Sequence, residues 1–211
     1  MNRFTTSTTV AVLLLFPAMP TMAQTNLTVA GGVNRATVNV EGVGLIPGQE
    51  WVNRLAIGAS IGIPLLERLG LHLGAGYSQK GFALSVFGVE TTTEVDYLEI
   101  TALAGVPIPV GERTSVHLLA GPALAFKLSC QLSVTFMGDS GTEDCGEDGP
   151  NAMDLGLMGG ARLVIGVSEK LGLSLDALYN HGLLDMDDID SEIIFKNRVM
   201  TLQAGIVYSI G

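Results

Sequence analysis

The stretch LGLSLDALYNH, residues 171–181, decides the fold of this chain because its side chains alternate with a period of two. Leucine, alanine and tyrosine occupy the odd positions from 171 to 179, and small or polar residues occupy most of the even positions. A period of two is the side-chain period of a β-strand. The same alternation recurs along the chain and predicts eight strands, at about residues 27–34, 51–63, 69–81, 94–106, 114–129, 153–167, 171–181 and 196–210.

The connections between these predicted strands are alternately long and short. The short ones are about 64–68, 107–112 and 168–170, and the long ones are about 35–50, 82–93, 130–152 and 183–195. Short periplasmic turns and long external loops are typical of outer-membrane barrels. The sequence therefore predicts an all-β fold: an eight-stranded antiparallel up-and-down transmembrane β-barrel with its apolar face outward.

A soluble ligand-binding barrel would show the same alternation, but its apolar face would line a cavity. Here the opposite face is rich in Gly, Ser and Ala and carries few charges, which is a poor surface for a soluble protein. Small side chains do fit inside a narrow eight-stranded barrel. The mean hydropathy of +0.43 agrees with the membrane barrel. The soluble barrel remains an alternative.

Residues 1–23 have the pattern of an export signal. Residues 1–9 carry one cation, Arg3, and no acid, and a short apolar run follows at residues 10–16. This run is too short to span a bilayer as a helix, and a small-residue cleavage site ends at Ala23. We therefore expect two parts, a signal peptide at 1–23 that is cleaved after Ala23 and a barrel at 24–211 in the bacterial outer membrane.

The net charge and the two cysteines indicate which partners and which cellular compartment to expect. The formal net charge is −10, and no basic stripe is present, so nucleic acid is not an expected partner. Acidic residues gather in two of the long connections, at 139–148 and 185–192. Cys130 and Cys145 share one long connection of an exported chain, so we expect a disulfide. Closing a loop of this size stabilises by roughly 3 kcal/mol in the chain-entropy model.

Charged and polar residues on the inward faces predict a polar network in the lumen. A charge inside a barrel must be paired or hydrated, and eight strands leave an interior just wide enough for side chains. An ion-pair plug is favoured, and a polar channel is the alternative. The predicted network consists of Arg54, His72, Glu99, Lys127, Asp154, Arg162 and Asp176.

Aromatic residues near the outer ends of the strands predict an interface girdle on the apolar faces. Its members are Trp51, Tyr77, Phe126 and Tyr179. Aromatic residues make up only 6% of the chain.

Two patterns suggest other chemistry. The acidic run at 185–192 invites calcium, but the central glycine of an EF-hand is absent, so a solvated loop is favoured. A lipid-modifying enzyme could use His181 with Ser78 or Ser129, yet no nucleophile-elbow motif occurs. We therefore expect no metal site, no cofactor and no catalytic activity.

Several stretches resemble the bacterial outer-membrane β-barrel domain family, the porin-like small barrels of unassigned role. They are 74–81, 95–100, 119–122, 154–160, 173–180 and 196–198. The C-terminus resembles the signal read by the barrel-assembly machinery, with Gln203, Gly205, Tyr208 and Ile210 at its polar, glycine and hydrophobic positions. The chain ends on Ile210-Gly211 instead of the usual aromatic residue. The resemblance implies an integral outer-membrane protein in contact with lipid and lipopolysaccharide, and no named ligand.

These observations together predict a monomeric envelope protein with a structural or surface-interaction role through its external loops, accompanied by weak passive permeation. The alternatives are a small porin or channel, a lipid-modifying enzyme at the outer leaflet, and the soluble ligand-binding barrel. The external partner is not specified by any motif.

Overall fold

The alternating segments form β-strands in a computed structural model that describes residues 24–41, 47–146, 149–185 and 194–210. The predicted signal peptide, most of the acidic run at 185–192, and Glu147 and Asp148 lie outside these residues. The described residues contain no helix that is long and apolar enough to cross a membrane. The strands are β1 (Thr25–Glu41), β2 (Gln49–Glu50), β3 (Val52–Leu66), β4 (Leu69–Val86), β5 (Val89–Pro109), β6 (Thr114–Phe136), β7 (Asp139–Asp144), β8 (Met153–Gly166), β9 (Leu171–Gly182) and β10 (Ile194–Ile210).

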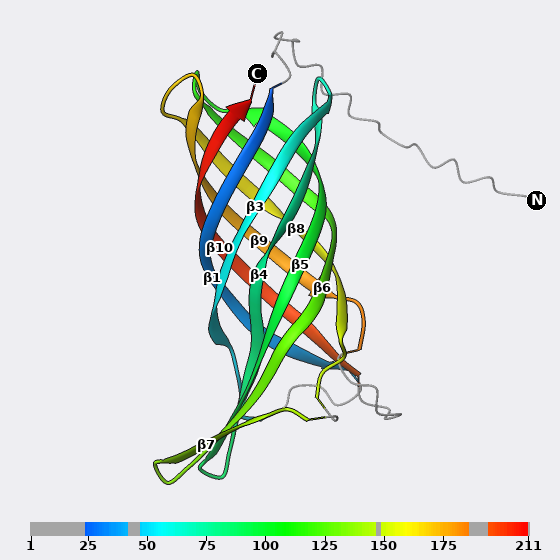
Figure 1. Ribbon diagram of the computed structural model, residues 1–211, viewed down its shortest axis with the longest axis vertical. Helices are drawn as coiled ribbons and strands as arrows, with labels where there is room; N and C mark the ends of the chain where they lie inside the picture. The colour runs from blue at the N-terminus through cyan, green and yellow to red at the C-terminus, as the bar shows by residue number, and fades with distance from the viewer. Residues whose placement is uncertain (1–23, 42–46, 147–148, 186–193, 211) are drawn as a thin grey trace, which may run out of the picture.

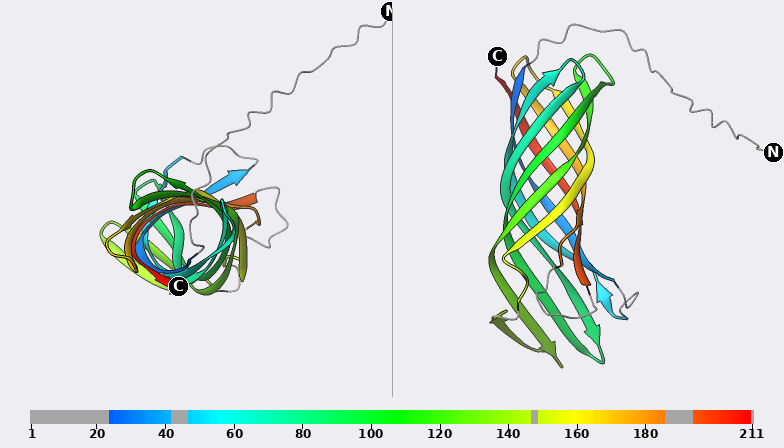
Figure 2. Two further views of the ribbon diagram at one scale, coloured as in Figure 1. Left: turned by 90° about the horizontal axis from the view of Figure 1, so that it is seen from above. Right: turned by 90° about the vertical axis from the view of Figure 1, so that its right-hand side faces the viewer.

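Eight of these strands close into a barrel (Figure 1). β1 pairs antiparallel with β3 on one side and with β10 on the other, and the ring runs β1-β3-β4-β5-β6-β8-β9-β10. The view along the axis in Figure 2 shows the closed ring. The predicted eight-stranded antiparallel barrel is confirmed, and closure leaves the ring without an unpaired edge.

The two faces of the wall differ as the alternation requires. Outward side chains are apolar and exposed, for example Leu173, Leu175 and Ile206. Inward side chains on the same strands include Ser174 and Asp176, which are buried. An outer wall of exposed Leu, Ile and Val is the surface that hydrocarbon solvates, since in water it would form one continuous apolar patch.

The connection predicted at 82–93 is wrong as a loop. β4 continues to Val86 and β5 begins at Val89, so only Phe87 and Gly88 form the turn. Both turn residues have positive φ, 50° and 79°, as a two-residue turn of type I′ requires. The connection predicted at 130–152 is likewise mostly strand, because β6 reaches Phe136 and turns into β7 through Met137 and Gly138.

These long strands extend the wall past the barrel rim into a protruding sheet, which we define as residues 82–96 and 129–144. It comprises the outer parts of β4, β5 and β6 together with β7, and it projects at the end opposite the start of β1 and the end of β10 (Figure 1). One face continues the outward side and is polar, with Glu90, Thr92, Ser133 and Thr142 in register. The other face continues the lumen side and is largely apolar.

The opposite end of the barrel has only short turns. β3 and β4 are joined by Glu67 and Arg68, β5 and β6 by residues 110–113, and β8 and β9 by residues 167–170. The predicted short connections therefore share one end with the chain termini of the barrel. In an outer-membrane barrel, that end is the periplasmic one.

Candidate functional site: the barrel lumen and its outer rim

A buried polar layer crosses the outer half of the lumen. The Lys80 Nζ of β4 lies 2.9 Å from Glu99 Oε2 of β5 and 3.3 Å from Asp154 Oδ2 of β8. Asn197 of β10 donates to the same Asp154 oxygen at 2.8 Å. One cation and two acids therefore connect strands on different sides of the ring.

Aromatic and amide groups complete this layer. The Lys80 ammonium lies 5.0 Å from the ring centroid of Tyr97, a cation–π contact. Asn34 of β1 donates to Ser78 Oγ at 3.0 Å and to the main-chain oxygen of Gln79 at 2.9 Å. Thr201 of β10 donates to Asn34 Oδ1 at 2.7 Å. The layer therefore ties β1, β4 and β10 together by side chains inside the barrel.

A second ion pair lies in the periplasmic half of the lumen. The Arg162 guanidinium of β8 binds Asp176 of β9 in a bidentate manner, with Nε–Oδ1 and Nη2–Oδ2 both at 2.8 Å. Asp176 is fully buried. The rings of His72 and His117 meet edge to face with centroids 5.8 Å apart. A Cβ at Gly105 would lie 2.7 Å from the His72 ring, so glycine is needed there to admit this imidazole.

Two small cavities lie along the lumen. One of about 100 Å³ is lined by residues between the two layers, including Ser78, Glu99 and Arg162. The other, of about 150 Å³, is lined by His117, Ser168 and Ser209, and it also touches Arg162. Both are partly polar and are large enough for water. Arg162 and His72 line both cavities, so the Arg162 layer lies between them.

An apolar cluster lies beyond the outer layer. Val38 and Val40 of β1 are buried and pack against Phe82 of β4 and Phe195 of β10. These four side chains lie on the inner side of the wall beyond the Lys80 layer, toward the protruding sheet.

The predicted lumen residues divide into two groups. Glu99, Asp154, Arg162 and Asp176 form the ion pairs above, and His72 lies beside Arg162 on the cavities. Arg54 and Lys127 are elsewhere, at the outer rim.

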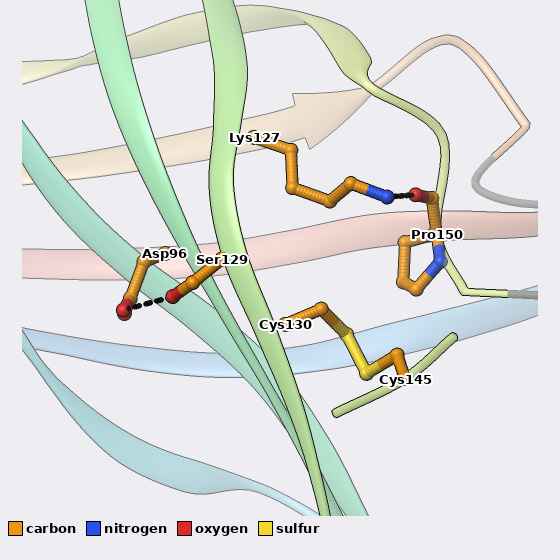
Figure 3. The surroundings of a disulfide bond; sticks show 6 residues. All are labelled: Asp96, Lys127, Ser129, Cys130, Cys145 and Pro150. Atoms are coloured by element: carbon orange, nitrogen blue, oxygen red, sulfur yellow. Dashed lines mark hydrogen bonds between the residues drawn. A yellow bond between two sulfur atoms is a disulfide. The ribbon is translucent and has the colours of Figure 1, made fainter. Parts of the chain in front are cut away.

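At this rim, Arg54 Nε lies 3.1 Å from Glu94 Oε2, and Gln79 donates to both Glu94 and Asp96. Lys127 donates to the main-chain oxygen of Pro150 (Figure 3). Arg54 thus supports the wall where β3 leaves β4, and Lys127 holds the segment that returns to β8.

Sequence reasoning missed the central cation of the outer layer. Lys80 is at an even position of β4, on the same face as His72 and Ser78, and this parity was available from the sequence. The predicted end of this strand at Gly81 placed Lys80 beside a supposed loop. Asn34 and Asn197 were missed because an amide gives no charge signal.

The four aromatic residues predicted as a girdle lie on the outward face near the outer end of the barrel. Trp51, Phe126 and Tyr179 are each about two-fifths exposed (43%, 38% and 40%). The ring of Tyr179 meets the ring of His181 at a centroid distance of 6.4 Å. At the other end of the wall, Tyr208 and Ile210 of the predicted assembly signal also face outward, while Gln203 and Gly205 face inward.

A disulfide joins the base of the β6–β7 hairpin. Figure 3 shows the bond between Cys130 and Cys145. The two residues are 15 positions apart, and their Cα atoms are 5.4 Å apart. Beside it, Ser129 donates to Asp96 at 2.6 Å and links β6 to β5. The predicted disulfide is present, and it ties the end of β7 to β6 at the base of their hairpin.

The residues considered for catalysis are not brought together. Ser78 points into the lumen and bonds to Asn34, whereas His181 is on the outward side of the wall. Ser129 is on β6, which β8 separates from β9, and its hydroxyl is bonded to Asp96. Within the described ranges, no group of three or more His, Cys, Asp or Glu is placed to hold a metal ion. Asp185, the first residue of the acidic run, accepts a hydrogen bond from the Phe195 amide at 3.0 Å.

Comparisons with known proteins agree with this architecture. The model of the family described as "Outer membrane protein beta-barrel domain" matches residues 22–188. No curated protein matches the chain. Among solved structures, Neisserial surface protein A is similar with a TM-score of 0.52 at 13% identity, over 88% of this chain and 97% of that one. OprG from Pseudomonas aeruginosa is similar with a TM-score of 0.54 at 12% identity, over 89% and 96%.

Proposed function

Since the chain belongs to the outer membrane protein β-barrel domain family, we propose that its barrel is a closed anchor in the outer membrane and that its protruding sheet is the working surface. The localisation follows from the family and from the similar outer-membrane structures. The role of the sheet is our proposal. It is a surface-interaction role, without catalysis and without a cofactor.

One observation carries this proposal: the wall continues past the rim and ends in two tight turns with apolar tips. Phe87 is 100% exposed and Met137 is 87% exposed. Both have the left-handed backbone conformation that bulky side chains disfavour. An apolar side chain held in water at the cost of backbone strain suggests a function for it, and contact with an external partner is that function.

The closed lumen supports an anchor over a channel. The Lys80 layer, the Arg162–Asp176 pair and the apolar cluster around Phe82 each interrupt the interior. Purified protein in planar lipid bilayers should therefore show no discrete current steps. Steps that change in size when Glu99 is replaced by Gln would favour the small-channel alternative.

The sheet itself can be tested on cells. A strain that displays the wild-type protein should be retained on protein-coated glass under flow, and the double variant Phe87→Asn with Met137→Asn should be retained less. Asparagine tolerates the left-handed conformation, so the hairpins keep their shape. Equal retention, with equal surface amounts and unchanged heat-modifiable gel mobility, would contradict the role given to the tips.

The same proposal includes the biogenesis predicted from the sequence. We take the chain to be a monomer whose last strand, with Tyr208 and Ile210 on its lipid side, is read by the barrel-assembly machinery. Deletion of residues 208–211 tests this: the truncated chain should accumulate unfolded in the periplasm. Normal insertion of the truncated chain would refute it.

A further inference from the structure

Cationic side chains follow the apolar band on one side of the barrel wall. On β1 the outward residue after Val33 is Arg35, and on β10 the outward residues beyond Met200 are Arg198 and Lys196. We define Arg35, Lys196 and Arg198 as the outer basic patch. It lies where hydrocarbon-facing residues give way to polar ones, at the outer end of the wall.

The strand register brings the two arginines of this patch close together. Arg35 is directly opposite Met200, and Arg198 is opposite Thr37. They are therefore diagonal neighbours on one face of an antiparallel pair, with Cα atoms about 7–8 Å apart. The two guanidinium groups lean apart, that of Arg35 toward Trp51 beside β3 and that of Arg198 toward Gly182 of β9, so they are placed to bracket two anionic groups of one ligand.

Neither arginine is neutralised by the described part of the chain. The Arg35 guanidinium lies over the Trp51 ring, 5.9 Å from its centroid. The Arg198 Nη1 donates to the main-chain oxygens of Gly182 and Asn197, each at 3.3 Å. Among the described residues, no carboxylate is within ion-pair distance of Arg35 or Arg198. Each guanidinium has five N–H donors in a planar fork, and this geometry suits phosphate.

The depth of the patch identifies the ligand class. Trp51 and Tyr179 are on the same side of the barrel, and aromatic residues of this kind sit at the headgroup level of a bilayer. The opposite side of the rim, by contrast, carries Glu94 and Asp96 on β5. Two other cations of the outer rim are already engaged, Arg54 with Glu94 and Lys127 with the main-chain oxygen of Pro150. The arginines of the outer basic patch face outward at headgroup depth, where an anionic lipid can reach them.

We propose that the outer basic patch binds the phosphate groups of the phosphorylated glycolipid in the outer leaflet, with Arg35 and Arg198 as the main contacts. One lipid would then be held against β1 and β10, with its acyl chains along Val33, Met200 and Leu202. This site is separate from the protruding sheet, so it stands or falls independently of the proposed function.

The test uses the full-length processed protein folded in detergent and titrated with lipid A that carries two phosphates. Trp51 is the only tryptophan of the chain, so its emission reports on ligand beside Arg35. Native mass spectrometry counts the bound lipid as a second readout. We expect saturable binding of one lipid, and about a fivefold loss of affinity for each of Arg35→Gln and Arg198→Gln, hence about 25-fold for both.

Control variants distinguish binding at the outer basic patch from a general effect of positive charge. Arg113→Gln with Lys170→Gln removes two exposed cations at the periplasmic end and should leave the affinity unchanged. Arg35→Lys with Arg198→Lys keeps the charge and should recover part of it. The proposal is overturned if dephosphorylated lipid A binds equally well, or if the periplasmic pair loses as much affinity as the outer pair. Saturation of the patch by inorganic phosphate at similar concentrations would overturn its assignment to a lipid.

Discussion

Replacement of Lys80 by Met should destabilise the barrel strongly, because among the residues that the structure describes this lysine is the only cation of the buried outer layer. Its side chain is 2% exposed, and it faces two carboxylates at 2.9 and 3.3 Å. Removal of one partner of a buried ion pair costs about 3–5 kcal/mol, since the remaining charge is left unpaired away from water. Lys80→Met leaves two such charges, Glu99 and Asp154, so we expect a loss of free energy of unfolding at the upper end of that range.

The measurement is reversible denaturant unfolding of the protein folded in lipid vesicles, followed by heat-modifiable gel mobility and Trp51 emission. The control is Arg54→Gln, which breaks an ion pair of similar length, 3.1 Å, whose side chains are partly exposed at the rim, 19% and 34%. Because solvent reaches this pair, the control should lose clearly less free energy of unfolding than Lys80→Met. The triple variant Lys80→Met, Glu99→Gln and Asp154→Asn removes all three charges and should recover most of the stability. If Lys80→Met unfolds within about 1 kcal/mol of wild type, the lysine is hydrated and the lumen is not sealed as described.

Three further outcomes follow from other parts of the wall. The double variant Cys130→Ser with Cys145→Ser should leave the unfolding of the barrel unchanged but speed hydrogen exchange and proteolysis in β7. The reason is that the lost constraint, roughly 3 kcal/mol, acts on one hairpin. A lower unfolding midpoint for the whole barrel would contradict this. Gly105→Ala should cost about 1–3 kcal/mol in denaturant unfolding, because the new methyl group meets the His72 ring at 2.7 Å, and His72→Ala in the same chain should relieve the cost. Phe87→Asn should slow hydrogen exchange at Val86 and Val89, because asparagine removes a left-handed strain of about 1 kcal/mol; faster exchange would show that Phe87 packs against the hairpin.

The ring of eight strands could be predicted because a lipid-facing wall imposes the same alternation on every strand: apolar residues face outward, and small or polar residues face inward. Strand starts at the periplasmic end, such as Leu69, Thr114 and Leu171, follow directly from the alternation. At the outer end the sequence no longer follows this alternation, since outward positions of the protruding sheet carry polar residues such as Glu90 and Thr92. Threonine at 91–93 and the turn pairs Phe87-Gly88 and Met137-Gly138 therefore looked like loop, although the backbone there is extended or tightly turned.

For the lumen, the sequence predicts which polar residues face inward but not which of them are in contact. Alternation assigns Glu99, Asp154 and Arg162 to the inner face, but it cannot say which of them meet. Lys80 and Asp154 are 74 positions apart and on strands that are not neighbours in the ring, so their contact depends on the register of every strand between them. Arg54 shows the opposite error: it has inward parity, yet it reaches Glu94 at the rim where β3 and β4 separate.

The position of the disulfide has a consequence for the order of biogenesis. Both sulfurs belong to one hairpin, and no other ring strand intervenes between Cys130 and Cys145. The two cysteines can therefore be oxidised while the polypeptide is still in transit through the periplasm, before the barrel strands have paired. Because the disulfide closes a loop of only 15 positions, it adds little to the width of the unfolded chain. It also does not determine which pair of ring strands is the last to form.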